Sequence, residues 1–240
     1  MIVLFGLVGL LVGGLLNWAG DNLPRRASGG AILSLEPISW PGLALWRMLT
    51  ASISRGSLMR SQKSLWLGSA VEVFATLLFA YLWERFGLSW RLLLLALNCS
   101  FFLLIAIIDL KYRLVLNMLI YPAVVLMLLF HSMPPGRDTI AALLGGAVGL
   151  SPFFLVSLTK PGSIGGGDVK LAALIGLTVG FPRVLWALTV GILAGGIIAL
   201  LLALTRRWGL KSYMPYAPFL CLGAIIALLY DPLPLIFSLW

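Results

Sequence analysis

Two aspartates lie at the ends of apolar segments, where together they could activate water. Asp109 closes the run Leu103-Leu-Ile-Ala-Ile-Ile-Asp, and Asp168 follows three consecutive glycines. Two carboxyl groups brought close together share one proton, because the first negative charge disfavours the second. The ionised carboxylate can take a proton from water, and the protonated one can donate to a developing oxyanion. This is the chemistry of peptide hydrolysis without a metal or a covalent intermediate.

The residues around Asp168 suit an extended peptide substrate. Gly165, Gly166 and Gly167 carry no Cβ, so a substrate backbone could approach this segment closely. The loop 161–167 is too rich in glycine and proline to be regular helix, which marks it as a functional segment. We expect the three glycines and Lys170 to bind substrate or to support the site.

A third acid, Glu72, lies inside another apolar segment. An ionisable group in a membrane segment is costly unless it is neutralised, paired or hydrated, so Glu72 is also a functional candidate. We expect it to support the site, and the alternative is a bond to a neighbouring helix. The other five acids fall where water can solvate them: Asp21 and Glu36 in the first connection, and Glu84, Asp138 and Asp231 at outer ends.

Structural roles for the same acids remain alternatives. Asp109 could form an ion pair with Lys111 or Arg113, and Asp168 could form one with Lys170, in each case locking two helices together.

Metal and nucleophile chemistry have little support in the sequence. The single histidine, His131, lies near an expected outer loop, which argues against a histidine-rich site. The two cysteines, Cys99 and Cys221, lie far apart within apolar segments and form neither a CxxC pair nor a disulfide framework. We therefore predict no metal site.

The segments that must position these residues are long and apolar. The chain has 240 residues, of which 61% are hydrophobic and 10% are charged, and this composition predicts an all-α polytopic membrane protein. We expect one domain over residues 1–240. The apolar runs predict about eight membrane-spanning helices, at 2–20, 65–83, 90–108, 118–132, 139–157, 169–181, 184–204 and 214–230.

The basic residues predict how these helices are oriented. Most of the 17 lysines and arginines fall in the odd-numbered connections, which the positive-inside rule places in the cytoplasm, with both chain termini on the outer side. Asp109 and Asp168 then lie at the same cytoplasmic side and can meet. The net charge of +9 is explained by topology, so we predict the lipid bilayer, and no nucleic acid, as a partner.

The longest connection, at about 24–64, is cytoplasmic in this arrangement. It contains Trp40-Pro-Gly-Leu-Ala-Leu-Trp46, with apolar residues that continue at helical spacing. A short helix at the membrane interface and an irregular loop are both consistent with this pattern. In the first apolar run, Gly9 and Gly13 form a small-xxx-small pattern that lets a neighbouring helix approach closely.

Four further segments accompany the run Gly165-Gly-Gly-Asp168, which has the GxGD form. They are 9–18, 71–80 with Glu72, 107–117 with Asp109, and 214–219. In this order and spacing the chain resembles the type IV prepilin peptidases, which are GxGD intramembrane aspartyl proteases. The resemblance implies that Asp109 and Asp168 are catalytic. It also implies cleavage of the basic leader of prepilins or pseudopilins at the cytoplasmic face of the bacterial inner membrane, with no cofactor for proteolysis.

The resemblance also raises a second activity. Many bacterial members methylate the new N-terminus with S-adenosylmethionine, and those members commonly carry two CxxC pairs, suited to zinc, in the first cytoplasmic connection. The connection 24–64 has no cysteine, so we predict no zinc and leave methylation open. The segment Ala75-Thr76 also departs from the family pattern, which often has Thr-Gly there.

Two functions of other classes remain as alternatives. A proton- or ion-coupled carrier could use paired acids beside a glycine-broken helix, although the sequence shows one such break and no inverted repeat. An assembly scaffold without catalysis would use the two aspartates only as ion-pair partners, and it would tolerate Asp→Asn changes.

Overall fold

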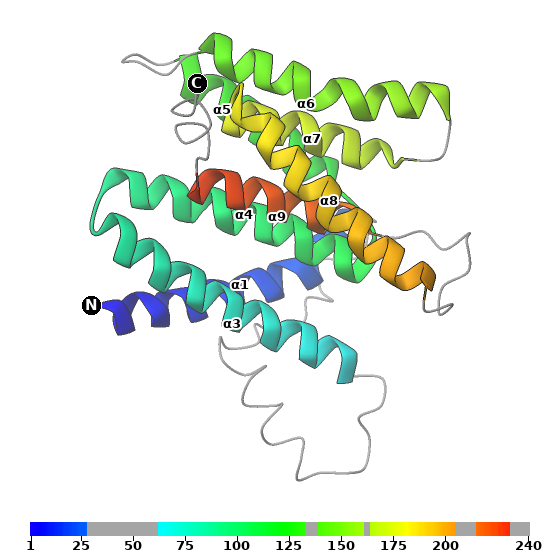
Figure 1. The fold of residues 1–240 in the computed structure, drawn as a ribbon. Helices are drawn as coiled ribbons and strands as arrows, with labels where there is room; N and C mark the ends of the chain where they lie inside the picture. The colour runs from blue at the N-terminus through cyan, green and yellow to red at the C-terminus, as the bar shows by residue number, and fades with distance from the viewer. Residues whose placement is uncertain (28–61, 133–138, 161–163, 205–214, 231–240) are drawn as a thin grey trace. The chain divides into compact units, whose positions relative to one another are not determined.

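The computed structural model describes residues 1–27, 62–132, 139–160, 164–204 and 215–230, and the regular structure within these ranges is helical (Figure 1). The helices are α1 (Ile2–Ala27), α3 (Gln62–Phe86), α4 (Trp90–Tyr112), α5 (Asn117–Ser132), α6 (Thr139–Thr159), α7 (Gly166–Val179), α8 (Arg183–Leu204) and α9 (Ala217–Leu229). The chain divides into two compact units, residues 1–107 and 108–240. One domain over 1–240 stays a prediction.

In the first unit, α1 packs closely against α3. A Cβ added to Gly9 would lie 2.9 Å from the Cα of Thr76, and one added to Gly13 would lie 2.9 Å from the Cα of Glu72. These two glycines therefore let the helix backbones touch, as their spacing predicts. Asn17, one turn further along α1, donates from Nδ2 to the carbonyl of Gly68 at 2.9 Å and ties the same two helices together.

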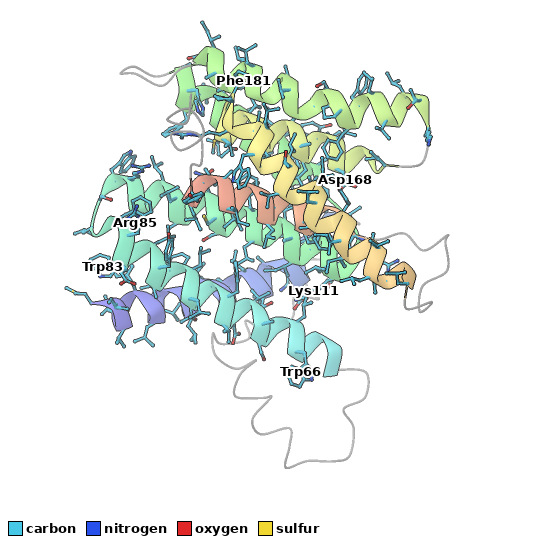
Figure 2. All side chains as sticks on the ribbon, viewed as in Figure 1. Trp66, Trp83, Arg85, Lys111, Asp168 and Phe181 are labelled. Carbon is cyan, nitrogen blue, oxygen red and sulfur yellow. The ribbon has the colours of Figure 1, made fainter. Side chains whose placement is uncertain are left out.

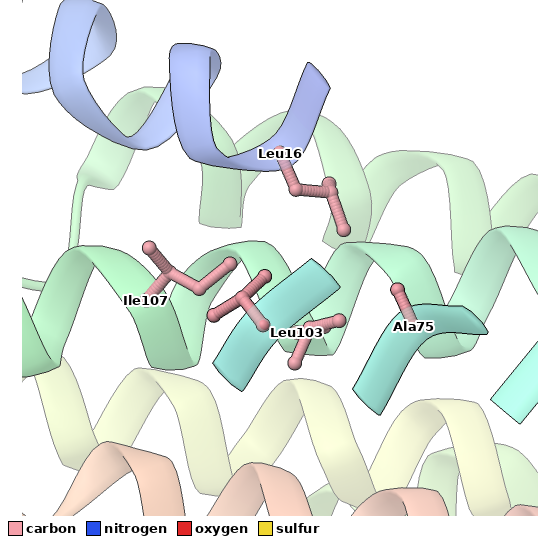
Figure 3. Close-up of a cluster of buried hydrophobic side chains, with 5 residues drawn as sticks. Leu16, Ala75, Leu103 and Ile107 are labelled. Carbon is pink, nitrogen blue, oxygen red and sulfur yellow. The ribbon is translucent and has the colours of Figure 1, made fainter. Parts of the chain in front are cut away.

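A small apolar cluster joins α4 to this pair. Leu16 of α1, Ala75 of α3, and Leu103 and Ile107 of α4 are all buried within it (Figure 3). Because lipid tails are as apolar as these side chains, their close van der Waals packing, and not removal of apolar surface from water, stabilises the contact. The cluster thus holds the body of α4, whose last residues belong to the second unit.

The second unit is built around α7, which packs against α5, α6, α8 and α9. Its side chains Leu171, Ala172 and Ile175 are fully buried. On the α6 side, Gly145 lies against the backbone of Gly176 so closely that a Cβ on either residue would overlap the other chain. This short helix is therefore fixed on several sides, and so is the aspartate in its first turn.

Within the described ranges, five helices are long and apolar enough to cross a membrane: α1, α3, α4, α6 and α8. Large apolar side chains such as Leu97, Leu155 and Leu200 are more than half exposed, which suits contact with lipid tails. The protein is thus an all-α, multi-pass membrane protein. The number of crossings and the outer location of both termini stay predictions.

Each of the eight predicted runs corresponds to a helix, but two details of the prediction are wrong. Helix α1 continues to Ala27, so Asp21 is helical and does not lie in a connection. Helix α7 begins at Gly166, so Gly166 and Gly167 are helical, because the Gly165 carbonyl accepts the N–H groups of Asp168 and Val169 and starts the first turn. Most of the connection 24–64, with its interfacial helix or loop, lies outside the described residues.

Candidate active site

Asp109 lies in the last turn of α4, where the helix ends abruptly. Arg113 has a φ of 54°, in the left-handed region, and its N–H donates to the Asp109 carbonyl at 2.8 Å. A left-handed residue after the last turn is a common way to end a helix. The chain then needs only residues 113–116 to reach α5, so the side chain of Asp109 lies beside a tight connection.

The carboxylate of Asp109 is buried, with 5% of the residue exposed. It accepts a hydrogen bond from the backbone N–H of Ala217, the first residue of α9, and the charge of Arg113 also acts on it. Its Oδ2 atom is buried and has no hydrogen-bond partner among the described residues. A buried carboxylate oxygen without a partner is unusual, and in a hydrolase it can accept a hydrogen bond from a reacting water.

Asp168 lies in the first turn of α7, ahead of the predicted span 169–181 (Figure 2). The backbone N–H of Gly165 donates to its carboxylate. Burial, and to a smaller extent the charge of Asp109, raise the pKa of Asp168 to about 6. The hydrogen bond from Gly165 lowers this pKa and so opposes both effects. The influence of Asp109 means that the two carboxylates, 59 positions apart in sequence, act on each other in the folded unit.

The start of α9 lies beside both aspartates. Ala217 donates to Asp109, and the preceding residue, Tyr216, lies within the electrostatic field of Asp168. The ring of Tyr216 is 6.1 Å from the ring of Phe153 on α6, measured between centroids. A Cβ added to Gly195 of α8 would lie only 2.8 Å from the same ring. Tyr216 precedes α9, and its ring is held beside the acids by packing against α6 and α8.

The three glycines before Asp168 have different surroundings. A Cβ on Gly165 would lie 3.4 Å from Oδ2 of Asp168, and one on Gly166 would meet nothing within 4 Å. A Cβ on Gly167 would lie 2.7 Å from the Cβ of Val115, inside van der Waals contact. Gly167 therefore lets α7 approach the connection that follows Asp109, whereas Gly166 faces open space.

Lys170 does not form the ion pair with Asp168 that the sequence left open. Its Nζ donates to Oδ1 of Asn117 at 3.0 Å and to the hydroxyl of Tyr121 at 3.0 Å. The ammonium also lies 5.1 Å from the centroid of the Tyr121 ring. Lys170 thus links α7 to the first turn of α5 through neutral partners.

Glu72 lies in the first unit, on α3, and only 2% of it is exposed. Its backbone carbonyl accepts a hydrogen bond from Oγ1 of Thr76 at 2.7 Å. Its supporting role toward the aspartates stays a prediction. Among the described residues, no three His, Cys, Asp or Glu side chains cluster so that they could hold a metal ion.

Sequence reasoning missed four residues of this site. Val115, Asn117, Tyr121 and Ala217 contact Gly167, Lys170 or Asp109. Ala217 acts through its backbone, so its residue type carried no signal. Asn117 and Tyr121 are one helical turn apart, and this spacing was the available sign that they could bind one partner together.

Residues 96–200, which contain both aspartates, match the model of the type IV leader peptidase family. A Bacillus subtilis protein described as a prepilin leader peptidase/N-methyltransferase is 29% identical over 161 residues, which cover 67% of this chain and 65% of that protein. A Pseudomonas aeruginosa protein with the same description is 26% identical over 257 residues, covering 93% of this chain and 88% of that protein. The alignment thus spans slightly less than two thirds of the Bacillus protein. No solved structure matches the chain.

Proposed function

Residues 96–200 of this chain belong to the type IV leader peptidase family, and on that premise we propose that the protein is an intramembrane aspartyl endopeptidase. Asp109 and Asp168 are its catalytic residues. The observation that carries the proposal is the electrostatic coupling of two carboxylates from separate helices, the buried Asp109 and the half-buried Asp168; Asp109 keeps an oxygen without a hydrogen-bond partner among the described residues.

The surroundings of the two acids differ, and the difference favours one role for each. Asp109 is buried, which disfavours its charged form, but it accepts the Ala217 N–H at the positive end of α9 and lies near the charge of Arg113, and both of these favour the carboxylate. Asp168 has a pKa of about 6, so it keeps its proton more readily than an ordinary aspartate does. We assign Asp109 as the general base and Asp168 as the general acid.

The reaction then proceeds through one bound water. Asp109 takes a proton from the water, whose oxygen attacks the scissile carbonyl carbon, while Asp168 donates its proton to the carbonyl oxygen. Collapse of the tetrahedral intermediate breaks the C–N bond, and the amine leaves with a proton from the dyad. Gly166, exposed and with open space around it, gives an extended substrate room to approach Asp168.

The substrate proposed is the leader segment of a prepilin or pseudopilin, because both relatives are described as prepilin leader peptidases. Such a substrate places a hydrophobic helix in the bilayer and a basic leader in the cytoplasm. The protein is accordingly proposed to lie in the inner membrane, with its aspartates at the cytoplasmic side.

The same names include N-methyltransferase, so S-adenosylmethionine is the cofactor implied for a second activity. The buried polar side chains in the described part of the first unit are Asn17, Asn22, Ser69 and Glu72, on α1 and α3. None of them has a step in the two-aspartate reaction, and the mechanism contains no step through the methyl donor.

The direct test is cleavage of a purified model prepilin by this protein in liposomes, with the products mapped by mass spectrometry in water enriched in ¹⁸O. The mechanism predicts one cut after the basic leader and one ¹⁸O atom in the new carboxyl group of the leader. Absence of cleavage, while ions move across the same liposomes in a manner that depends on both aspartates, would support a carrier instead.

A further inference from the structure

Lys170 makes an unusual set of bonds for a lysine two residues away from a catalytic acid. Its ammonium is bound by an amide oxygen and a phenol oxygen, both at 3.0 Å, and it lies over the phenol ring. Both acceptors are neutral groups, so Lys170 forms charge–dipole hydrogen bonds and no ion pair with them. Charge-assisted hydrogen bonds of this kind are stronger than those between neutral groups.

The two acceptors belong to the segment that follows Asp109. Asn117 is the first residue of α5 and Tyr121 lies one turn later, and residues 113–116 alone separate α5 from the end of α4. This connection also touches α7, because Val115 packs against Gly167. The first turn of α7 therefore holds the chain after Asp109 at two points, Gly167 and Lys170.

A chain of four residues between two helix ends transmits a displacement almost directly. If the start of α5 moves away from α7, the connection 113–116 moves with it and pulls on the end of α4, which displaces Asp109 against its hydrogen bond to Ala217. Asp168 stays with α7, which is buried against α6, α8 and α9. The distance between the two carboxylates thus depends on the attachment of α5 to α7.

We propose that Lys170 is a positioning residue for the reaction: by binding Asn117 and Tyr121 it sets the separation of Asp109 and Asp168. This inference rests on the proposed function. The ammonium of Lys170 is engaged by Asn117 and Tyr121, so its effect on catalysis passes through α5 and the connection 113–116.

The test measures the geometry without relying on proteolysis. In a background with Cys99→Ser and Cys221→Ala, the pair Asp109→Cys and Asp168→Cys is treated with a short bifunctional thiol reagent, and the crosslinking rate is measured. We expect the rate to fall several-fold when Lys170→Met is added. The same fall is expected for Asn117→Ala with Tyr121→Phe, which removes both acceptors and leaves the charge unchanged.

Two controls separate positioning from general damage. Arg91→Met removes a positive charge from α4 in the first unit and should leave the crosslinking rate unchanged. Lys170→Arg, which keeps a charged donor, should restore most of the rate. Thermal melting confirms that each variant is folded. An unchanged crosslinking rate in folded Lys170→Met protein overturns the proposal, whether or not the wild type cleaves a prepilin.

In the otherwise native enzyme, the geometry predicts a selective loss of turnover. A displacement of about 1 Å between reacting groups can reduce the rate on the order of 100-fold. We expect Lys170→Met to lower kcat at least about 10-fold while KM changes little, because substrate binding does not use this lysine. A rise in KM with unchanged kcat would instead make Lys170 a substrate-binding residue and would contradict the positioning role.

Discussion

The three glycines before Asp168 provide a graded test of the site, because each would place an added methyl group in a different environment. The perturbation is Gly→Ala at each position in turn. The new Cβ meets Val115 Cβ at 2.7 Å for Gly167, Asp168 Oδ2 at 3.4 Å for Gly165, and nothing within 4 Å for Gly166. We expect Gly167→Ala to be the damaging change.

The magnitude follows from the contact distance. Carbon atoms pack at about 3.5–4.0 Å, so a Cβ at position 167 must push α7 and Val115 apart by about 1 Å. Overpacking of this kind costs about 1–3 kcal/mol, and replacing a helical glycine by alanine returns about 1 kcal/mol. Stability should change little, whereas a shift of about 1 Å beside Asp109 should lower kcat on the order of 100-fold.

The assay combines prepilin cleavage with thermal melting in detergent. Gly166→Ala is the matched control, since it gains the same helix propensity without a contact, and it should melt higher than Gly167→Ala. Adding Val115→Gly to Gly167→Ala removes the opposing Cβ and should restore most of the activity, with Val115→Gly alone measured beside it. Full activity of Gly167→Ala would refute the reasoning, because the contact would then not position Asp109.

Three other outcomes follow from the same structure. A general acid works while it holds its proton, so with an Asp168 pKa of about 6 the value of kcat/KM should fall about tenfold per pH unit above about pH 6. It should also fall at low pH, where the base Asp109 becomes protonated, so the pH profile should be bell-shaped. The raised pKa also means that ionised Asp168 destabilises the fold; raising it from 3.8 to about 6 corresponds to about 3 kcal/mol. Asp168→Asn should therefore be more stable than wild type at pH 8, and the difference should vanish as the pH falls below about 4, in denaturation curves at the two pH values. In Gly145→Leu the new side chain would collide with the backbone of Gly176, so this change should lower the free energy of unfolding by about 3 kcal/mol or more and reduce the yield of folded protein. Gly196→Leu should do neither, because a Cβ at that position meets nothing within 4 Å.

Much of the fold could be predicted from the sequence because apolar runs are a strong local signal. All eight runs became helices, and the spacing of Gly9 and Gly13 correctly predicted a close helix contact in α1. Helix ends were less predictable. Helix α7 begins at Gly166 although its first turn contains two glycines, because the carbonyl of Gly165 accepts hydrogen bonds from the N–H groups of both Asp168 and Val169.

The candidate site was predictable only in its acidic residues. Asp109 and Asp168 stood out because an acid is costly in an apolar segment. The Ala217 N–H that binds Asp109 belongs to α9, and a backbone donor leaves no mark in the sequence. The sequence predicts that Lys170 supports the site, but it leaves an ion pair between Lys170 and Asp168 as an alternative. Its true partners, Asn117 and Tyr121, lie about 50 positions away and were brought near by packing of α5 on α7.

Cleavage of a model prepilin by Asp109→Asn and Asp168→Asn proteins tests whether Asp109 and Asp168 act together on one water. Each change keeps the side-chain size and removes an acid, so both variants should fold, as thermal melting can verify. Losing one group of an acid–base pair typically costs about 10²- to 10⁴-fold in rate, and the account predicts a loss at least this large for each variant. Normal cleavage by either folded variant would contradict it.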